Sequence, residues 1–126
     1  MKTLKFIFAV VVVALLMGGC KYDFIVPEEI PTPNPDQPVS FATQIVPIFT
    51  TDDCVSCHKA GGQSPDLTSA DIYSQIVPAL VDTTNPESSI IYDFPAPSTS
   101  KHSWKKYSAA QAAYILNWIK EGAKDN

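Results

Sequence analysis

The chain has 126 residues and a formal net charge of −4, with thirteen acidic side chains against nine basic ones, all of them lysines. This acidic balance excludes a nucleic-acid-binding function, which needs a basic surface. The length allows one small domain rather than several.

The first nineteen residues predict a secretory signal. Lys2 and Lys5 form a positive start, and residues 6–17 are an unbroken apolar run that is too short to span a bilayer. The run ends at Met17-Gly18-Gly19-Cys20, which resembles a bacterial lipobox, in which Cys20 is lipidated and becomes the mature N-terminus. The alternative is an uncleaved membrane anchor with an incidental cysteine. Either interpretation predicts that the remainder works outside the cytoplasm.

Residues 20–38 predict an extended, lipidated tether. Five prolines fall within residues 27–38, and a polyproline-like chain spans roughly 3 Å per residue. We therefore expect a domain held a few nanometres from a membrane through Cys20, facing the periplasm or the cell surface.

Residues 39–126 predict one small all-α domain of short helices and long loops. The first helix follows Ser40 as N-cap, and Pro47 is expected to kink or end it. Further helices are expected at 69–77, closed by Pro78, and from Asn85-Pro86 to about residue 92. Residues 50–66, with one turn at most, and 94–106 read as loops.

The last helix has the strongest signals. Ser108 and Gln111 form a capping box, residues 109–121 are unbroken helix formers, and Gly122 stops the helix. No segment shows the alternation expected of a strand. An 88-residue domain buries only a marginal core, so a cofactor or cross-link is expected to add stability, and Cys54 and Cys57 are its only cysteines.

Cys54-Val55-Ser56-Cys57-His58 has the spacing of the haem c attachment sequence. Two thiols three positions apart can add to the two vinyl groups on one edge of a porphyrin, while the adjacent imidazole turns onto the iron. The motif therefore predicts one covalent haem c, with His58 as a metal ligand.

Two rival sites use the same cysteines. A tetrahedral zinc site could be built from Cys54, Cys57, His58 and His102, although a histidine directly after the second cysteine is poorly placed and exported thiolates face oxidation. A thioredoxin-like redox pair requires a βαβ unit, and no strands are predicted.

The chain resembles the short single-haem cytochrome c lipoproteins of Gram-negative bacteria over most of residues 39–126. The resemblance rests on four motifs in order: Phe41-x-x-x-Ile45-x-Pro47-Ile48-Phe49, the attachment motif, Gly62-x-x-Pro65-x-Leu67, and Trp118-Ile119-x-x-Gly122-Ala123-x-x-Asn126. It implies a small cytochrome c-like fold wrapped around the haem.

Within that fold, the resemblance implies particular contacts. The first and last helices would cross, bringing Phe41, Ile45 and Phe49 against Tyr114, Leu116 and Trp118. The carbonyl of Pro65 would accept a hydrogen bond from the His58 ring, and Leu67 would pack on the porphyrin face.

The sixth iron ligand departs from the commonest family pattern. Met1 and Met17 are the only methionines, and both lie in the predicted signal, so His/Met ligation is impossible in the processed chain. His102 is the only other histidine, in the loop where the family supplies its distal ligand. We expect bis-histidine ligation. The alternative is a surface histidine beside Lys101, Lys105 and Lys106, with the iron five-coordinate or bound by a lysine.

The loop around His102 holds two further candidates. Trp104 is expected to neighbour the haem. The three lysines could dock an acidic redox partner, or could simply be a solvated charged face.

These features predict a membrane-anchored electron carrier rather than an enzyme. Two axial imidazoles saturate the iron, so we expect redox protein partners, no small-molecule substrate and a lower potential than His/Met ligation gives. The alternatives are a five-coordinate haem that binds gas or reduces peroxide, and a haem-stapled interaction module of a larger membrane complex.

Overall fold

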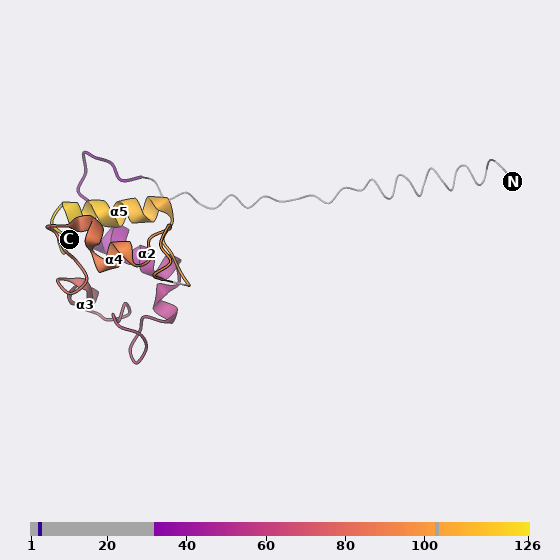
Figure 1. The fold of residues 1–126 in the computed structure, drawn as a ribbon, viewed down its shortest axis with the longest axis horizontal. Helices are drawn as coiled ribbons and strands as arrows, with labels where there is room; N and C mark the ends of the chain where they lie inside the picture. The colour runs from indigo at the N-terminus through magenta and orange to yellow at the C-terminus, as the bar shows by residue number, and fades with distance from the viewer. Residues whose placement is uncertain (1–2, 4–31, 103) are drawn as a thin grey trace.

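The computed structural model describes Thr3, residues 32–102 and residues 104–126 (Figure 1). The predicted signal segment, apart from Thr3, and the predicted lipidation site Cys20 lie outside the described residues. Within the described residues, no helix has the length and apolar character needed to cross a membrane.

The described part of the chain is helical and contains no strand, which confirms the all-α prediction. In chain order, the helical segments are η1 (Phe41–Ile45), α2 (Val46–Thr51), η2 (Cys54–Ser56), α3 (Ile72–Ile76), η3 (Pro86–Ser88), α4 (Ile90–Asp93) and α5 (Ala109–Lys120). Helix α5 runs along one side of the domain, where η1 and α4 pack against it, and α3 lies farther away (Figure 1).

The first helix begins at the predicted N-cap. The Ser40 hydroxyl accepts a hydrogen bond from the Thr43 amide at 3.3 Å, and the chain then turns as a π-helix in η1 before changing to an α-helix at Val46. Pro47 does not end the helix: it lies in the first turn of α2, directly after the π-helical turn, and the helix continues to Thr51.

The two middle helices are shorter than predicted. Helix α3 starts after Asp71, whose carboxylate accepts from the Ser74 amide at 3.3 Å, and it ends before Pro78 as expected. The helix predicted from Asn85 to Tyr92 is broken in two at Ser89. The buried Ser89 hydroxyl accepts from the Asp82 amide at 2.9 Å and donates to the Asp82 carbonyl at 3.2 Å. These tertiary bonds hold Ser89 in an extended conformation, ψ 130°, that interrupts the helix.

Helix α5 matches its prediction closely. Both bonds of the capping box between Ser108 and Gln111 are present, and Gly122, at φ +96°, follows the last turn. The stack of Phe41 on Trp118, with ring centroids 5.1 Å apart, confirms the expected contact between the first and last helices. The buried core includes Phe41, Ile45 and Phe49 on the first side and Tyr114, Ile115, Trp118 and Ile119 from α5, whereas Leu116, also expected at this contact, is only half-buried.

The packed domain starts at Val39 and is closed by the end of the chain. The Val39 amide donates to Glu121 Oε2 at 2.7 Å, and the Phe41 amide donates to Asn126 Oδ1 at 2.8 Å.

Before Val39, residues 34–37 form a hydrogen-bonded turn in which Asn34 Oδ1 accepts from the Asp36 amide at 3.0 Å. This part of the predicted tether is therefore not fully extended, because an asparagine side chain favours such a turn.

Candidate functional site

A cavity of about 500 Å³ lies beside the Cys54-x-x-Cys57-His58 motif. Its size falls within the range of ~300–1,000 Å³ common for ligand and cofactor sites. The cavity is bounded by the motif, the segment after it, helix α4 and the loop 95–107. It is lined by every cofactor residue predicted from the sequence: Cys54, Cys57, His58, Pro65, Leu67, His102 and Trp104.

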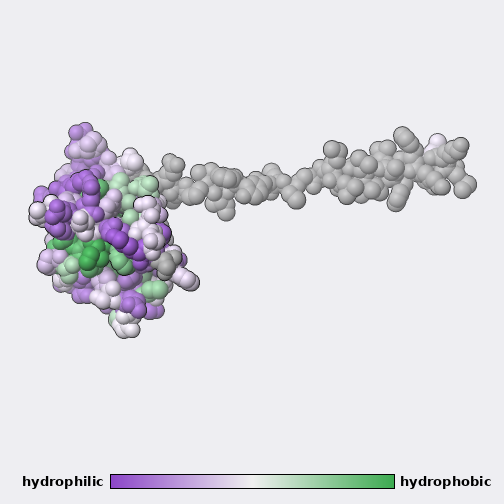
Figure 2. All heavy atoms as spheres, viewed as in Figure 1, coloured by the Kyte–Doolittle hydropathy of each residue, from purple (hydrophilic) through white to green (hydrophobic). Residues whose placement is uncertain are grey.

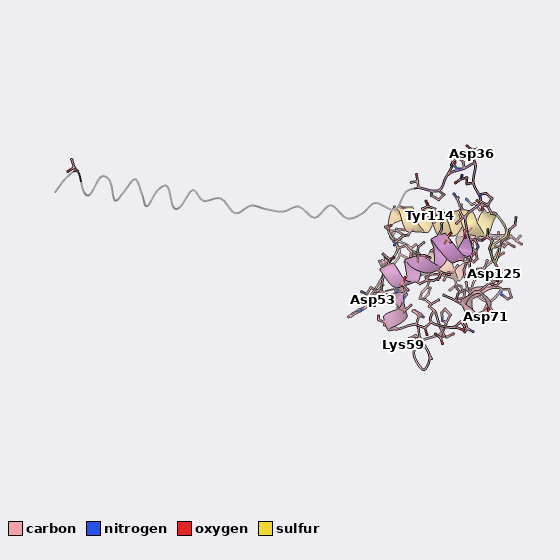
Figure 3. All side chains as sticks on the ribbon, turned by 180° about the vertical axis from the view of Figure 1, so that it is seen from behind. Asp36, Asp53, Lys59, Asp71, Tyr114 and Asp125 are labelled. Carbon is pink, nitrogen blue, oxygen red and sulfur yellow. The ribbon has the colours of Figure 1, made fainter. Side chains whose placement is uncertain are left out.

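Local backbone geometry brings the three motif side chains to one wall of the cavity. The single turn η2 is closed by bonds from the Cys57 and His58 amides to the Cys54 carbonyl, at 3.2 and 3.0 Å. The turn begins at Asp53 with φ +55°, a left-handed conformation that aspartate tolerates better than most residues. Asp53 lies at one edge of the domain, with Asp71 and Asp125 at the other (Figure 3).

The chain after the motif folds back onto it through Gly62. The Gln63 amide donates to the Cys57 carbonyl at 2.9 Å, and a Cβ on Gly62 would lie only 2.3 Å from that carbonyl oxygen. The Leu67 amide then bonds to the His58 carbonyl at 3.0 Å, which places Leu67 next to the histidine. Only glycine permits this close return of the backbone.

His58 and His102 come together from two distant parts of the chain. Their ring centroids are 6.2 Å apart, and their planes differ by 25°. The His102 ring also meets the edge of Phe94, with centroids 6.1 Å apart. Each histidine has its Nδ1 atom buried without a hydrogen-bond partner among the described residues. The predicted bond from the His58 ring to the Pro65 carbonyl is therefore not formed through Nδ1, although Pro65 does line the cavity.

The exposed large apolar side chains of the described residues lie around the cavity. Among the described residues, the large hydrophobic side chains left in solvent are Ile90, Phe94 and Trp104, which are 52%, 44% and 79% exposed, and all three line this cavity. A hydrophobic area is also visible on the surface between α3 and α4 (Figure 2). Exposed apolar surface concentrated around one concave site is typical of a place where another molecule binds.

Two weak acids at the cavity, the half-buried Cys54 and the buried Tyr107, have raised pKa values. Burial, assisted by the negative charge of Asp52, raises the pKa of the Cys54 thiol from 9.0 to about 11. Burial likewise raises the pKa of Tyr107, and charges at Cys54 and Asp52 add to the effect. A reactive redox thiol needs the opposite shift, so the surroundings of Cys54 do not favour the thioredoxin-like alternative.

Other residues that line the cavity were not predicted from the sequence as cofactor neighbours. Phe49, Ile91, Phe94 and Tyr107 contribute to the apolar wall, and Asp53 and Lys105 form an ion pair at 3.3 Å. In the described part of the chain, no group of three or more His, Cys, Asp or Glu side chains is arranged to hold a metal ion by itself.

Comparison with protein-family models, with characterised proteins and with solved structures produces no match to this chain.

Proposed function

We propose that the protein is a one-electron carrier that holds a single covalent haem c in this cavity, with His58 and His102 as the two axial ligands. The observation that carries the proposal is the 6.2 Å separation of the two imidazole rings, combined with the position of both cysteines on the same cavity wall.

The ring separation suits ligands on opposite faces of one metal. A zinc–histidine bond of about 2.0–2.1 Å serves as a guide, and a nitrogen lies about 1.1 Å from the centre of a five-membered ring with bonds near 1.33 Å. Opposite imidazoles on one metal therefore have ring centres roughly 6.2–6.5 Å apart. Tetrahedral ligands would bring the centres to about 5.1 Å. The observed separation of 6.2 Å agrees with the first of these values, which supports the haem proposal.

The protein groups around the cavity have separate tasks in this proposal. Cys54 and Cys57 would form the thioethers, and Phe49, Leu67 and Ile91 would exclude water from the haem faces. A bound haem c supplies reversible exchange of one electron. Because imidazoles would take both axial positions, no position is left for a substrate, and a redox protein would be the partner. Bis-histidine ligation should also keep the potential below that of His/Met cytochromes.

The membrane attachment belongs to the same proposal. Lipidation at Cys20 would keep the carrier at a membrane, facing the periplasm or the cell surface, and residues 21–38 would connect it to the domain.

An absorption spectrum of protein produced with a cytochrome c maturation system tests the proposal. The expected product has one haem per chain that resists extraction by acidic organic solvent and is low-spin in both oxidation states. The double variant Cys54→Ala/Cys57→Ala is the control, from which the same solvent should remove any haem. Purified protein with zinc and no haem would overturn the proposal, and high-spin haem would favour gas binding or peroxide reduction.

A further inference from the structure

The loop that carries His102 is a self-contained unit. Its ends are joined by a bond from the Tyr107 amide to the Pro95 carbonyl at 3.0 Å. The Thr99 amide donates to the Ala96 carbonyl at 3.2 Å, and the Lys106 ammonium donates to the Thr99 carbonyl. Compact loops of this kind, with close ends and internal contacts, are often functional, and they open more easily than the core.

Among the described residues, two ion pairs attach this loop to the rest of the domain. Lys101 pairs with Asp93 at the end of α4, where the loop begins. Lys105 reaches across to Asp53, with Nζ 3.3 Å from Oδ2, and Asp53 directly precedes Cys54. The Lys105–Asp53 pair is therefore the ionic contact that joins the His102 loop to the Cys54-x-x-Cys57-His58 motif.

Two further observations place this pair at the cavity. Lys105 and Asp53 both belong to its lining. The positive charge of Lys105 also acts on the Cys54 thiol, where it opposes the burial that raises the pKa. The carboxylate of Asp53 is presented from a left-handed residue at the start of η2, so its direction is set by the turn that presents the cysteines.

We propose that the Lys105–Asp53 ion pair is a strap that holds the His102 loop against the motif and so limits how often His102 leaves the iron. This inference rests on the proposed function. Lys105 and Asp53 are positioning residues, acting through His102 rather than touching the iron. Exposed ion pairs are weak, so removing this one should increase loop opening by about two- to fivefold.

Binding of carbon monoxide to the ferrous holoprotein measures the opening, because an external ligand can bind only after His102 has left. At saturating carbon monoxide, the rate becomes the opening rate. Lys105→Gln and Asp53→Asn should each raise it about two- to fivefold, and the double variant should raise it no further. Asparagine suits the test at position 53 because it tolerates the left-handed conformation. Lys105→Arg should restore the wild-type rate.

Lys120→Gln is the matched control. It breaks the Lys120–Glu87 pair, which has the same Nζ–carboxylate distance of 3.3 Å and similar exposure, but lies outside the cavity lining. Added salt screens the ion pair, so it should raise the opening rate of the wild type toward that of Lys105→Gln. The opening rate of Lys105→Gln itself should hardly change with salt. Equal rates in Lys105→Gln, Lys120→Gln and the wild type would overturn the strap.

Hydrogen exchange separates this inference from the proposed function. The Tyr107 amide, which closes the loop, should exchange faster in Lys105→Gln than in the wild type or Lys120→Gln whatever the state of the iron. A wild type that is already high-spin would overturn His102 ligation and the strap's effect on it. If the Tyr107 amide exchanges at the same rate in Lys105→Gln as in the wild type, the strap is overturned. That result would leave the proposed His102 ligation unaffected.

Discussion

The ring of Phe41 stacks on the ring of Trp118, with centroids 5.1 Å apart and planes inclined by 27°. Phe41 opens the first helical segment and Trp118 lies near the end of α5, so this contact ties together the two ends of the domain. The Trp118 indole N–H also donates to the Lys124 carbonyl at 2.8 Å, which fixes the chain after α5.

Truncation of Trp118 should therefore be among the most destabilising changes in the domain. Its side chain is 1% exposed, and Trp118→Ala should lower the free energy of unfolding by about 3–5 kcal/mol. Trp118→Phe keeps an aromatic ring but loses the hydrogen bond and some packing, so it should cost less. Urea unfolding followed by circular dichroism measures both. Trp104→Phe, at a 79% exposed position, is the control and should change stability by less than about 0.5 kcal/mol.

The two cysteines should differ in reactivity in protein made without haem. The thiolate is the reactive form, and the pKa of the Cys54 thiol is raised to about 11, so its alkylation rate should keep rising tenfold per pH unit beyond pH 9. The exposed Cys57 should react first at pH 8. Mass spectrometry after timed iodoacetamide treatment distinguishes the two sites. In denaturant, where burial is lost, the Cys54 rate should level off near pH 9, and a folded protein with the same profile would contradict the prediction.

Replacement of His102 tests the sixth ligand directly. His102→Ala should convert low-spin iron to high-spin and admit imidazole or carbon monoxide without a preceding opening step, because a coordination position becomes free. His102→Met should raise the potential if the loop places the sulfur on the iron, since a thioether favours ferrous iron. Optical spectra and redox titration provide the readouts. A wild-type spectrum that His102→Ala leaves unaltered would remove His102 from the site.

Replacement of Cys20 tests the proposed lipid attachment. Cys20→Ser should release the protein into the soluble periplasmic fraction or leave it unprocessed, because serine cannot accept the thioether-linked lipid. Fractionation with immunoblotting measures the change, and metabolic labelling with a fatty acid identifies the modified cysteine. Normal processing together with unchanged membrane association in Cys20→Ser would show that Cys20 is not the anchor.

Signals that act within a few residues were readable from the sequence. The caps at Ser40 and Ser108 and the stop at Gly122 each depend on bonds or dihedral preferences inside one helical turn, and the structure confirms them. The spacing of Cys54, Cys57 and His58 is also local, so their convergence on one cavity wall followed from the motif. Of the two effects expected of Pro47, the end of the helix did not occur, because the effect of a proline depends on where the α-helical register begins.

Relationships between distant residues were decided only by the tertiary structure. The sequence predicted one or two helical turns from Asn85 to about Tyr92, but it did not indicate the interruption at Ser89, whose hydroxyl bonds to the Asp82 backbone. The 6.2 Å approach of His102 to His58 and the pairing of Lys105 with Asp53 depend on how loop 95–107 folds over the motif. No periodicity or spacing encodes such contacts, because their geometry arises from the packing of the whole core and from the closure of the loop.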